Sequence, residues 1–427
     1  MGAYRDTAVR PADPLSFLLA DLAQAGLVRL HPLGPLELQD AAALLDDLLA
    51  GMPEKDRAAS SVLERAGGIP FFLVSYAQAV YAGAVEAVPW DIAQGVRQRV
   101  ALLPEATRQL LGVAAILGRR VPRVLLMASA GQPEEDVLLG LEAACRARLL
   151  VEEGEDGYVF AHDVIREVVE ADVGAARRSM LHRRVAETLE STSAGAPPEL
   201  QAHHFALGGD QDKAARYLEL AGDRAWGERA YAAAEGRYGA ALDRLERLGR
   251  AGDAARVREK LGEVLYRTGR YDAALDVLER AAETYRASDN MEGLVRVTAV
   301  IGWAHSLRGT TETGITLITV LLERLERIGA SPPSLAKPYE ALGWLLFTAG
   351  RYDASLKAGE RAAALARARG DDRTVALAEE NRINVLQMLG RLGDALRVGQ
   401  AVLPLAERVG DLECLWRTHI DMAYTYV

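Results

Sequence analysis

Two stretches of similar sequence, LGEVLYRTGRYDAALDVLERAAE (261–283) and LGWLLFTAGRYDASLKAGERAAA (342–364), decide the fold of much of this chain. Each contains an apolar helix, a Gly-Arg-Tyr-Asp turn and a second helix with apolar residues at helical spacing. Small residues fall where the two helices of such a hairpin must approach closely, at Gly262, Ala274, Gly343 and Ala363. The two stretches therefore predict a repeated helical hairpin.

Weaker copies of this hairpin occur around the two stretches. The equivalent positions are Tyr231, Tyr271, Thr311, Tyr352 and Leu392, at spacings of 40, 40, 41 and 40 residues. Such units stack into an α-solenoid, and they resemble tetratricopeptide repeats with a period longer than the usual ~34 residues. Long-helix variants of that repeat occur in the MalT-like sensor regions of bacterial regulators. We expect the solenoid to span residues 196–427.

Residues 96–195 have a different pattern. Amphipathic helices are expected at 103–118, 121–130 and 133–150. LLVEEGEDGYVFAH (149–162) follows, and its Asp-Gly turn between apolar runs indicates a two-stranded hairpin. Three helices followed by a hairpin are typical of a winged helix.

The first 34 residues look like the last piece of a larger domain. MGAYRDT (1–7) is expected to end a strand, PLSFLLADLAQAG (14–26) to form a helix and LVRLHPLG (27–34) to form a short strand. Two isolated strands do not make a stable sheet by themselves. We therefore interpret residues 1–34 as the remnant of an α/β domain.

Residues 35–95 are expected to form a helical lid domain. This segment contains GGIPFFLVSYAQAV (67–80), whose apolar residues have helical spacing. Pro70 suits the first turn of a helix, because its missing N–H would be unsatisfied there anyway. The whole chain is thus predicted to be mainly α, with a residual α/β piece, a lid, a winged helix and a solenoid.

Composition narrows the classes of function. Half of the residues are apolar, and the net charge of −10 disfavours a broad surface for nucleic acid or anionic membrane. Cys145 and Cys414 lie far apart in the sequence, so neither a disulfide framework nor a zinc site is expected. With no signal-peptide pattern and no apolar stretch of ~20 residues, a cytoplasmic location is expected.

The order of four short motifs, followed by the solenoid, resembles one family. The motifs are GAYRDT, LHPLGPLELQDAAALL, ERAGGIPFFL and LLVEEGEDGYVFAHDVIREVV. In this order they resemble the signal-transduction ATPases with numerous domains (STAND), in particular the MalT and large LuxR-type bacterial regulators. The likeness covers nearly the whole chain. It implies a regulator in which ATP or ADP is bound by the full-length protein.

The resemblance also implies roles for individual residues. Arg5 corresponds to the sensor arginine that reaches for the terminal phosphate. Gly68, Ile69 and Pro70 match the Gly-x-Pro motif that packs against adenine and ribose, and His162 matches the winged-helix histidine near the phosphates. Simpler alternatives stay open: an exposed terminal arginine, an ordinary helix start and a histidine satisfied by contacts between domains.

The sequence lacks the family's motifs for binding nucleotide phosphates and metal. No stretch has the pattern G-x-x-x-x-G-K-[ST] that holds nucleotide phosphates, and the acidic metal-binding strand is missing. We therefore expect no catalytic residue, no metal site and no cofactor in this chain, which is not expected to be an enzyme. It is interpreted as the downstream part of such a regulator, either a fragment or a natural truncated homologue.

The leading hypothesis is a signalling module whose solenoid senses a protein, a peptide or a small-molecule inducer while the winged helix relays the signal. A regulatory ATPase and a stand-alone repeat scaffold are the alternatives. DNA binding is disfavoured because the helix at 133–150 opens with Glu134, Glu135 and Asp136, which repel phosphates. His203 and His204 are adjacent on a helix and so do not face one metal site.

DLECLWRTHIDMAYTYV (411–427) reads as the first helix of a further repeat. Its candidate packing residues are Leu415, Trp416, Ile420, Met422 and Tyr424. No second helix or polar cap follows, so part of the apolar face is expected to stay exposed. Self-association through this end is the expected consequence.

Overall fold

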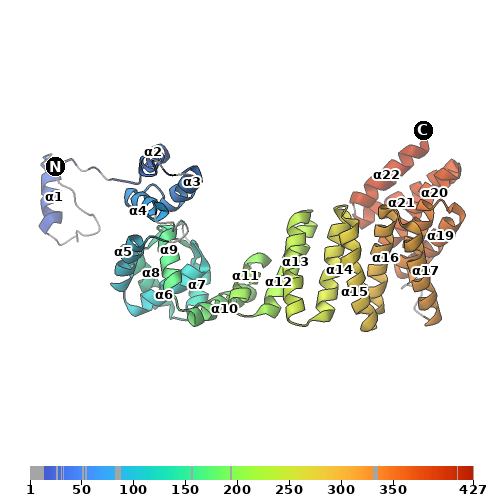
Figure 1. The fold of residues 1–427 in the computed structure, drawn as a ribbon, viewed down its shortest axis with the longest axis horizontal. Helices are drawn as coiled ribbons and strands as arrows, with labels where there is room; N and C mark the ends of the chain where they lie inside the picture. Colours follow the sequence, from blue (N-terminus) through green and yellow to red (C-terminus); the bar gives the residue numbers. More distant parts are fainter. Residues whose placement is uncertain are drawn as a thin grey trace. The chain divides into compact units, whose positions relative to one another are not determined.

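The computed structural model describes residues 14–25, 27–29, 31, 33–50, 52, 55–81, 88–154, 157–192, 195–329, 335–410 and 412–426. The chain divides into two compact units. One comprises residues 1–196 with 207–209, and the other comprises residues 197–206 with 210–427. Helices make up most of the described residues, which confirms the mainly α fold class (Figure 1).

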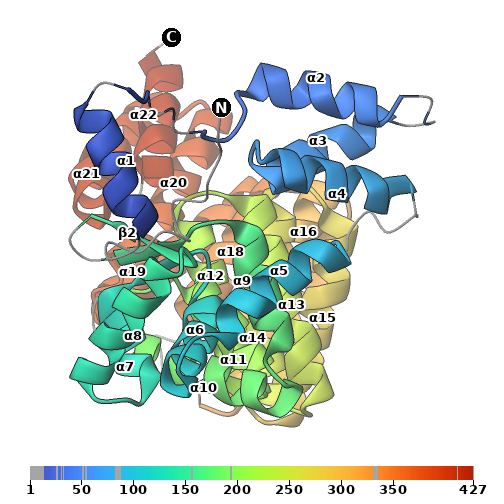
Figure 2. The ribbon, with the colours of Figure 1, turned by 90° about the vertical axis from the view of Figure 1, so that its left-hand side faces the viewer.

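The first unit begins with helices whose bounds are α1 (Pro14–Gln24), α2 (Leu38–Leu48), α3 (Lys55–Ala66), α4 (Pro70–Tyr81) and α5 (Trp90–Ala101). α2, α3 and α4 pack against one another (Figure 2). The helices expected at 14–26 and from Pro70 onward are confirmed by α1 and α4.

The strand expected at 27–34 is wrong, because the described residues of this segment belong to no strand. An extended segment needs a neighbouring strand to satisfy its backbone groups, and none pairs with these residues in the described sheet. A few residues further on, the N–H of Leu36 instead donates to the carbonyl of Gly68, 2.7 Å away. The other expected strand, at 1–7, lies outside the described residues.

The rest of the first unit combines helices with a small sheet. The helices are α6 (Glu105–Leu117), α7 (Arg123–Ala130), α8 (Glu134–Arg146), α9 (Asp163–Asp172) and α10 (Ala175–Ser191). The strands β1 (Arg120–Pro122), β2 (Leu150–Glu153) and β3 (Gly157–Phe160) form an antiparallel sheet in the order β1-β3-β2. The expected three helices and hairpin are confirmed, and β1 adds a strand where the sequence suggested the start of a helix.

One continuous apolar core joins α2 to α10. Leu45, Tyr76, Leu110 and Phe160 are among its largest side chains with almost no exposure. The segments expected to form a lid (35–95) and a winged helix (96–195) therefore share buried apolar contacts. This shared core fixes the α3–α4 turn against α9.

The second unit is built of paired helices. They are α11 (Pro198–Leu207), α12 (Gln211–Gly227), α13 (Tyr231–Arg247), α14 (Ala251–Arg267), α15 (Tyr271–Ala287), α16 (Met291–Arg308), α17 (Thr311–Arg327), α18 (Ala336–Thr348), α19 (Tyr352–Arg369), α20 (Asp372–Met388), α21 (Leu392–Val409) and α22 (Leu412–Tyr426). From α12 on, consecutive helices lie side by side along the unit (Figure 1). The five positions that marked the repeat are the first residues of α13, α15, α17, α19 and α21, so the repeat prediction is confirmed.

Close approach within the hairpins explains the small residues. A Cβ placed on Gly262 of α14 would lie 2.4 Å from the Cγ of Leu278 on α15. Ala274 and Ala363 are fully buried. The turn glycines Gly269 and Gly350 have φ of +77° and +72°, which a residue with a side chain rarely adopts. The Gly-Arg-Tyr-Asp turn thus has a steric reason for its glycine.

The last described helix, α22, packs on α20 and α21. Leu415 contacts a buried cluster there, and a Cβ on Gly399 would lie 2.6 Å from the Cγ of Met422. Trp416, expected to pack, is 63% exposed, so that expectation is wrong. Successive residues of a helix point about 100° apart, so Leu415 can pack on the cluster while Trp416 is exposed. The side chain of Tyr424 lies outside the described residues.

None of the helices in the described ranges is both long enough and apolar enough to cross a membrane.

Candidate functional site

The structure brings together four of the five site residues predicted from the sequence. Gly68 and Ile69 connect α3 to α4, Pro70 begins α4, and His162 precedes α9. The imidazole of His162 lies against this connection, because a Cβ placed on Gly67 would be 2.7 Å from His162 Nε2. Arg5, the fifth, lies outside the described residues.

Contacts within the protein occupy the His162 ring. His162 Nδ1 accepts a hydrogen bond from the N–H of Val164 at 3.4 Å, which caps α9. The ring also bonds to the main chain of Ala66 and meets the Phe72 ring edge-on, with centroids 4.9 Å apart. Because Nδ1 accepts, the proton resides on Nε2. Burial lowers the pKa of His162 and outweighs the opposing Ala66 bond, so the ring is neutral at pH 7.

Gly68 owes its identity to a backbone contact. Its φ is +74°, and a Cβ there would lie 2.4 Å from the carbonyl oxygen of Leu36. Arg65, just before the turn, forms an ion pair with Glu167 of α9 at 2.8 Å. These contacts join the α3–α4 turn to residues before α2 and to α9. They account for the geometry of the turn without a ligand, and a nucleotide contact by these residues stays a prediction.

A second candidate site is a groove in the repeat unit. It has a volume of about 380 Å³, and its lining comes mainly from the first helix of successive hairpins: α12, α14, α16, α18, α20 and α22. Its aromatic lining residues are Trp226, Tyr266, Trp303 and Trp344. Tyr266 and Trp303 lie with ring centroids 6.5 Å apart. An aromatic groove with charged groups is the usual form of a ligand site.

Buried glutamates recur at one position of these first helices. The position lies twelve residues before the start of the second helix of each hairpin, and it is occupied by Glu219, Glu259, Ala299, Glu340 and Glu380. Each of the four glutamates is at most 8% exposed. A buried carboxylate is costly unless it is paired, so each requires a partner or a shifted pKa.

Three of these glutamates pair with an arginine of the next first helix, 37 residues later. Arg256 binds Glu219 through two hydrogen bonds of 2.9 Å, and Arg296 binds Glu259 at 2.7 and 3.2 Å. Arg417 Nε lies 2.5 Å from Glu380 Oε1. We call this series of pairs the glutamate–arginine ladder. Paired guanidinium and carboxylate groups of this kind connect successive repeats.

Glu340 departs from the ladder. The position 37 residues later is Leu377, which also lines the groove. Within the described part of the chain, Glu340 has no hydrogen bond and no ion pair. Burial raises its pKa to about 8, although nearby Arg417 opposes the shift. At pH 7 this carboxyl group is therefore mostly protonated.

Asn381 is a second polar group in the wall of the groove, and it is 4% exposed. Ser355 Oγ donates to the carbonyl of Gly343 at 2.7 Å, so it can accept the N–H of Asn381 Nδ2 at 3.2 Å. That chain of donors fixes the orientation of the amide. Asn381 Oδ1 is then left buried without a partner in the described structure. An unsatisfied buried acceptor costs about 1–3 kcal/mol.

Three basic residues of the groove are more exposed than the acceptor groups of Glu340 and Asn381. Arg267, Lys337 and Arg373 line the groove and are exposed, whereas Glu340 and Asn381 are buried. Glu263 lies between these extremes, and burial together with Glu259 raises its pKa. The groove thus has acceptor groups in its floor and cations at its rim.

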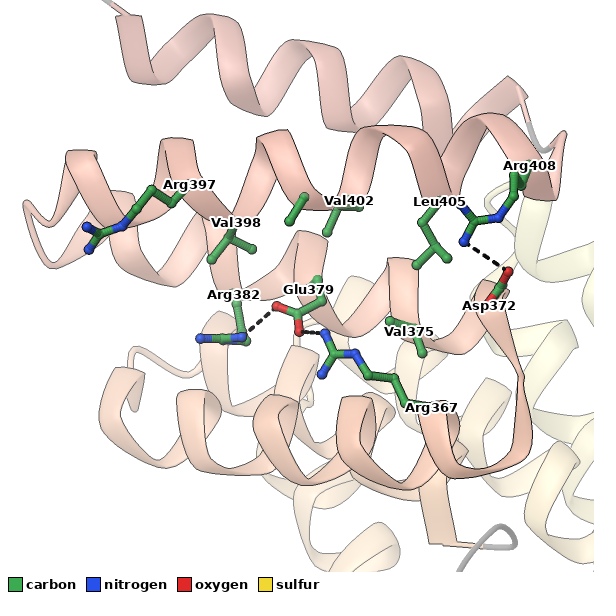
Figure 3. Close-up of a pocket in the computed structure, with 11 residues that line it drawn as sticks. Arg367, Asp372, Val375, Glu379, Arg382, Arg397, Val398, Val402, Leu405 and Arg408 are labelled. Carbon is green, nitrogen blue, oxygen red and sulfur yellow. Dashed lines mark hydrogen bonds and ion pairs between the residues drawn. The ribbon is translucent and has the colours of Figure 1, made fainter.

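A further groove, of about 580 Å³, lies along α20 and α21. Figure 3 shows its apolar floor of Val375, Val398, Val402 and Leu405. Arg367 and Arg382 both pair with the buried Glu379, and Arg408 lies 3.5 Å from Asp372 (Figure 3). Most of its charged groups pair with one another and Arg397 pairs with Asp394 outside it, so this groove offers a ligand fewer open polar groups than the first.

The described residues hold no group of three or more His, Cys, Asp or Glu arranged to bind a metal ion. His204 is buried and His203 is exposed, and their rings meet edge to face with centroids 5.3 Å apart.

Comparison with known proteins supports the repeat fold. The family profile described as tetratricopeptide repeat matches residues 232–296. A search of curated protein sequences finds no match. Among solved structures, the chain is similar to a signal transduction ATPase with numerous domains that has a tetratricopeptide repeat sensor, from Pyrococcus horikoshii. The identity is 14%, the TM-score is 0.53, and the match covers 92% of this chain and 57% of that one.

Two further similarities have lower scores. A Rap protein complexed with competence and sporulation factor is 13% identical, with a TM-score of 0.43, over 78% of this chain and 88% of that one. Aspartyl phosphate phosphatase F from Bacillus subtilis is 10% identical, with a TM-score of 0.39, over 92% and 96% of the two chains. The family profile and the match to the STAND protein, without these two, show a tetratricopeptide-type helical repeat fold, and the chain spans a little over half of the length of the STAND protein.

Sequence reasoning named no residue of the aromatic groove as a site. A signal existed, because Glu263, Trp303 and Trp344 occupy the same position in three successive hairpins, as the ladder glutamates do in theirs. Aligning the repeats and comparing equivalent positions would have found both the ladder glutamates and the series of Glu263, Trp303 and Trp344. Only the packing of the first helices shows that members of these two sets of equivalent positions line one groove.

Proposed function

We propose that this chain is the sensing and relay part of a STAND-type transcriptional regulator. In this proposal the repeat unit binds a protein, peptide or small-molecule signal, and residues 96–195 act as a winged helix that relays it to a nucleotide-binding domain. The aromatic groove is the observation that carries the proposal. It unites three tryptophans with two buried polar groups, the carboxyl group of Glu340 and Asn381 Oδ1, and the latter has no hydrogen-bond partner in the described structure. The similarity to a protein with a tetratricopeptide repeat sensor supports the same assignment.

A selection of random peptides on the immobilised full chain tests the sensing role. We expect enriched peptides to bind in solution and to lose affinity for the Trp344→Ala variant. Arg397→Ala, in the groove along α20 and α21, is the matched control and should leave binding unchanged. Peptides that bind the Trp344→Ala variant as tightly as the parent would contradict the proposal.

Nucleotide turnover and DNA binding are not part of the proposed activity. The sequence has no phosphate-binding loop, so the chain is expected to release no phosphate from ATP above background. In α8 the first-turn acids Glu134, Glu135 and Asp136 are exposed, where they would repel DNA phosphates. A phosphate-release assay tests the first expectation, and a filter-binding assay at low salt tests the second.

A further inference from the structure

The interruption of the glutamate–arginine ladder falls inside the aromatic groove. Glu219, Glu259 and Glu380 each pair with the arginine 37 residues later, but for Glu340 that position is Leu377, which also lines the groove. We propose that a cationic side chain of the ligand, a lysine ammonium or an arginine guanidinium, enters the groove head first and pairs with Glu340 in place of the missing ladder arginine. This inference rests on the proposed sensing function and specifies the chemistry of the ligand.

The intact pairs of the ladder indicate which chemical group suits the carboxyl group of Glu340. At Glu219 and Glu259 the carboxylate accepts two hydrogen bonds of 2.7–3.2 Å from a guanidinium, and at Glu380 a guanidinium forms an ion pair at 2.5 Å. Leu377 is shorter than arginine and apolar, so it fills less of the groove and supplies no charge. Glu340 and Leu377 both line the groove of about 380 Å³, so the unfilled space adjoins the residue that occupies the arginine position. A ligand cation restores a pairing that the rest of the repeat unit already uses.

The other charged groups near Glu340 do not replace the missing partner. Arg417 is held by Glu380 and lies 5.6 Å from the centre of the Trp344 ring. Lys337, one turn before Glu340 on α18, is exposed and forms no ion pair with it in the described structure. Arg373 of α20 is exposed at the rim. The cations that act on Glu340 therefore act at a distance, and its carboxyl group keeps its proton.

Two neighbouring features fit the same ligand group. Asn381 Oδ1 is an acceptor without a partner, and a guanidinium or ammonium group carries several N–H donors. Trp303 and Trp344 line the groove, and aromatic faces attract cations. The exposed Arg267, Lys337 and Arg373 at the rim suit a carboxylate elsewhere on the ligand. A peptide with a basic side chain and an acidic group or free C-terminus satisfies both parts.

Nα-acetyl-arginine and Nα-acetyl-citrulline form a matched pair of probes, because they share shape and carboxylate and differ in the charge of the head group. Calorimetry on the full chain should show Nα-acetyl-arginine binding at least about tenfold more tightly, as expected for a charge-assisted bond. Its affinity should rise by up to about tenfold per pH unit between pH 6 and 8, because pairing requires Glu340 to lose its proton. Glu340→Gln should remove both the preference and the pH dependence.

Two further variants distinguish a specific effect at Glu340 from a general loss of structure. Glu219→Gln makes the same chemical change at an intact ladder position outside the groove, and it should keep the preference for arginine. Leu377→Arg supplies the missing arginine from the chain itself and should abolish binding of Nα-acetyl-arginine. If that variant does not fold, the comparison of the two probes on the parent chain still tests whether the groove prefers a cationic head group.

Three results would overturn the inference: equal binding of the two probes, no binding of Nα-acetyl-arginine at millimolar concentration, or undiminished binding by Glu340→Gln. The peptide selection distinguishes this failure from failure of the sensing role. Peptides that depend on Trp344 but show no enrichment of lysine or arginine would leave the sensing role intact and refute the cationic head group.

Discussion

Replacing Glu340 by glutamine should remove a large part of the pH dependence of stability in the repeat unit. The carboxyl group has a pKa of about 8 in the folded chain, whereas an unfolded glutamate ionises near its ordinary value of 4.5. A carboxyl group with a raised pKa destabilises the fold as pH increases, because the unfolded chain releases its proton first. The free energy of unfolding therefore starts to fall near pH 4.5 and stops falling above about pH 8.

The magnitude follows from the two pKa values. One pH unit corresponds to 1.36 kcal/mol, so keeping the group neutral up to about pH 8 costs about 5 kcal/mol relative to acid conditions. Glutamine occupies nearly the same volume and does not ionise. We therefore expect the variant to gain most of this amount over the parent chain at pH 8, and little at pH 4.5.

Urea unfolding at half-unit steps from pH 5 to pH 9 measures the effect. Tryptophan fluorescence is a suitable probe, because Trp303 and Trp344 line the groove beside Glu340. Repeat proteins can unfold in segments, so the midpoint of this local signal is the quantity to compare.

Glu259→Gln is the matched control. Glu259 is as buried as Glu340, but it accepts hydrogen bonds from Arg296 and from the hydroxyl of Tyr285. Losing its charge leaves the guanidinium with a weaker partner and should destabilise the fold at pH 7 and pH 8. Parallel pH profiles for the parent chain and Glu340→Gln would refute the reasoning, as would a Glu259→Gln variant that behaves like Glu340→Gln.

Three other substitutions test the remaining contacts. Gly262→Ala should destabilise the α14–α15 hairpin by about 1–3 kcal/mol, because its Cβ would clash with Leu278; a thermal melt unchanged from the parent would contradict this. His162→Ala should lower stability by about 0.5–3 kcal/mol and speed hydrogen exchange at the start of α9, where protection equal to the parent's would count against the capping role. Trp416→Glu should abolish any concentration-dependent increase in mass seen by light scattering, because Trp416 is 63% exposed; a parent chain that is monomeric throughout would end the expectation of self-association.

The sequence by itself determined the repeat. A period of 40 or 41 residues, with glycine two residues before four of the five marked positions and small residues at the crossings, predicts a helical hairpin, because those constraints act within one repeat and its neighbours. The helix–helix–helix–hairpin order of the first unit was also readable, since amphipathic spacing and an Asp-Gly turn are local signals. The strand expected at 27–34 failed because strand formation depends on a partner elsewhere in the chain.

Only the tertiary structure decided what the polar residues do. Glu219, Glu259, Glu340 and Glu380 are equivalent in the sequence, yet three are paired and one is held protonated. The residue 37 positions later is an arginine that contacts each of the three paired glutamates, whereas for Glu340 it is Leu377, which has no charge. His162 likewise could be recognised from its motif, but its bond to Ala66 and its neutral state follow from burial against the α3–α4 turn. Burial and partners at long range set these properties, and a pattern along the chain does not contain them.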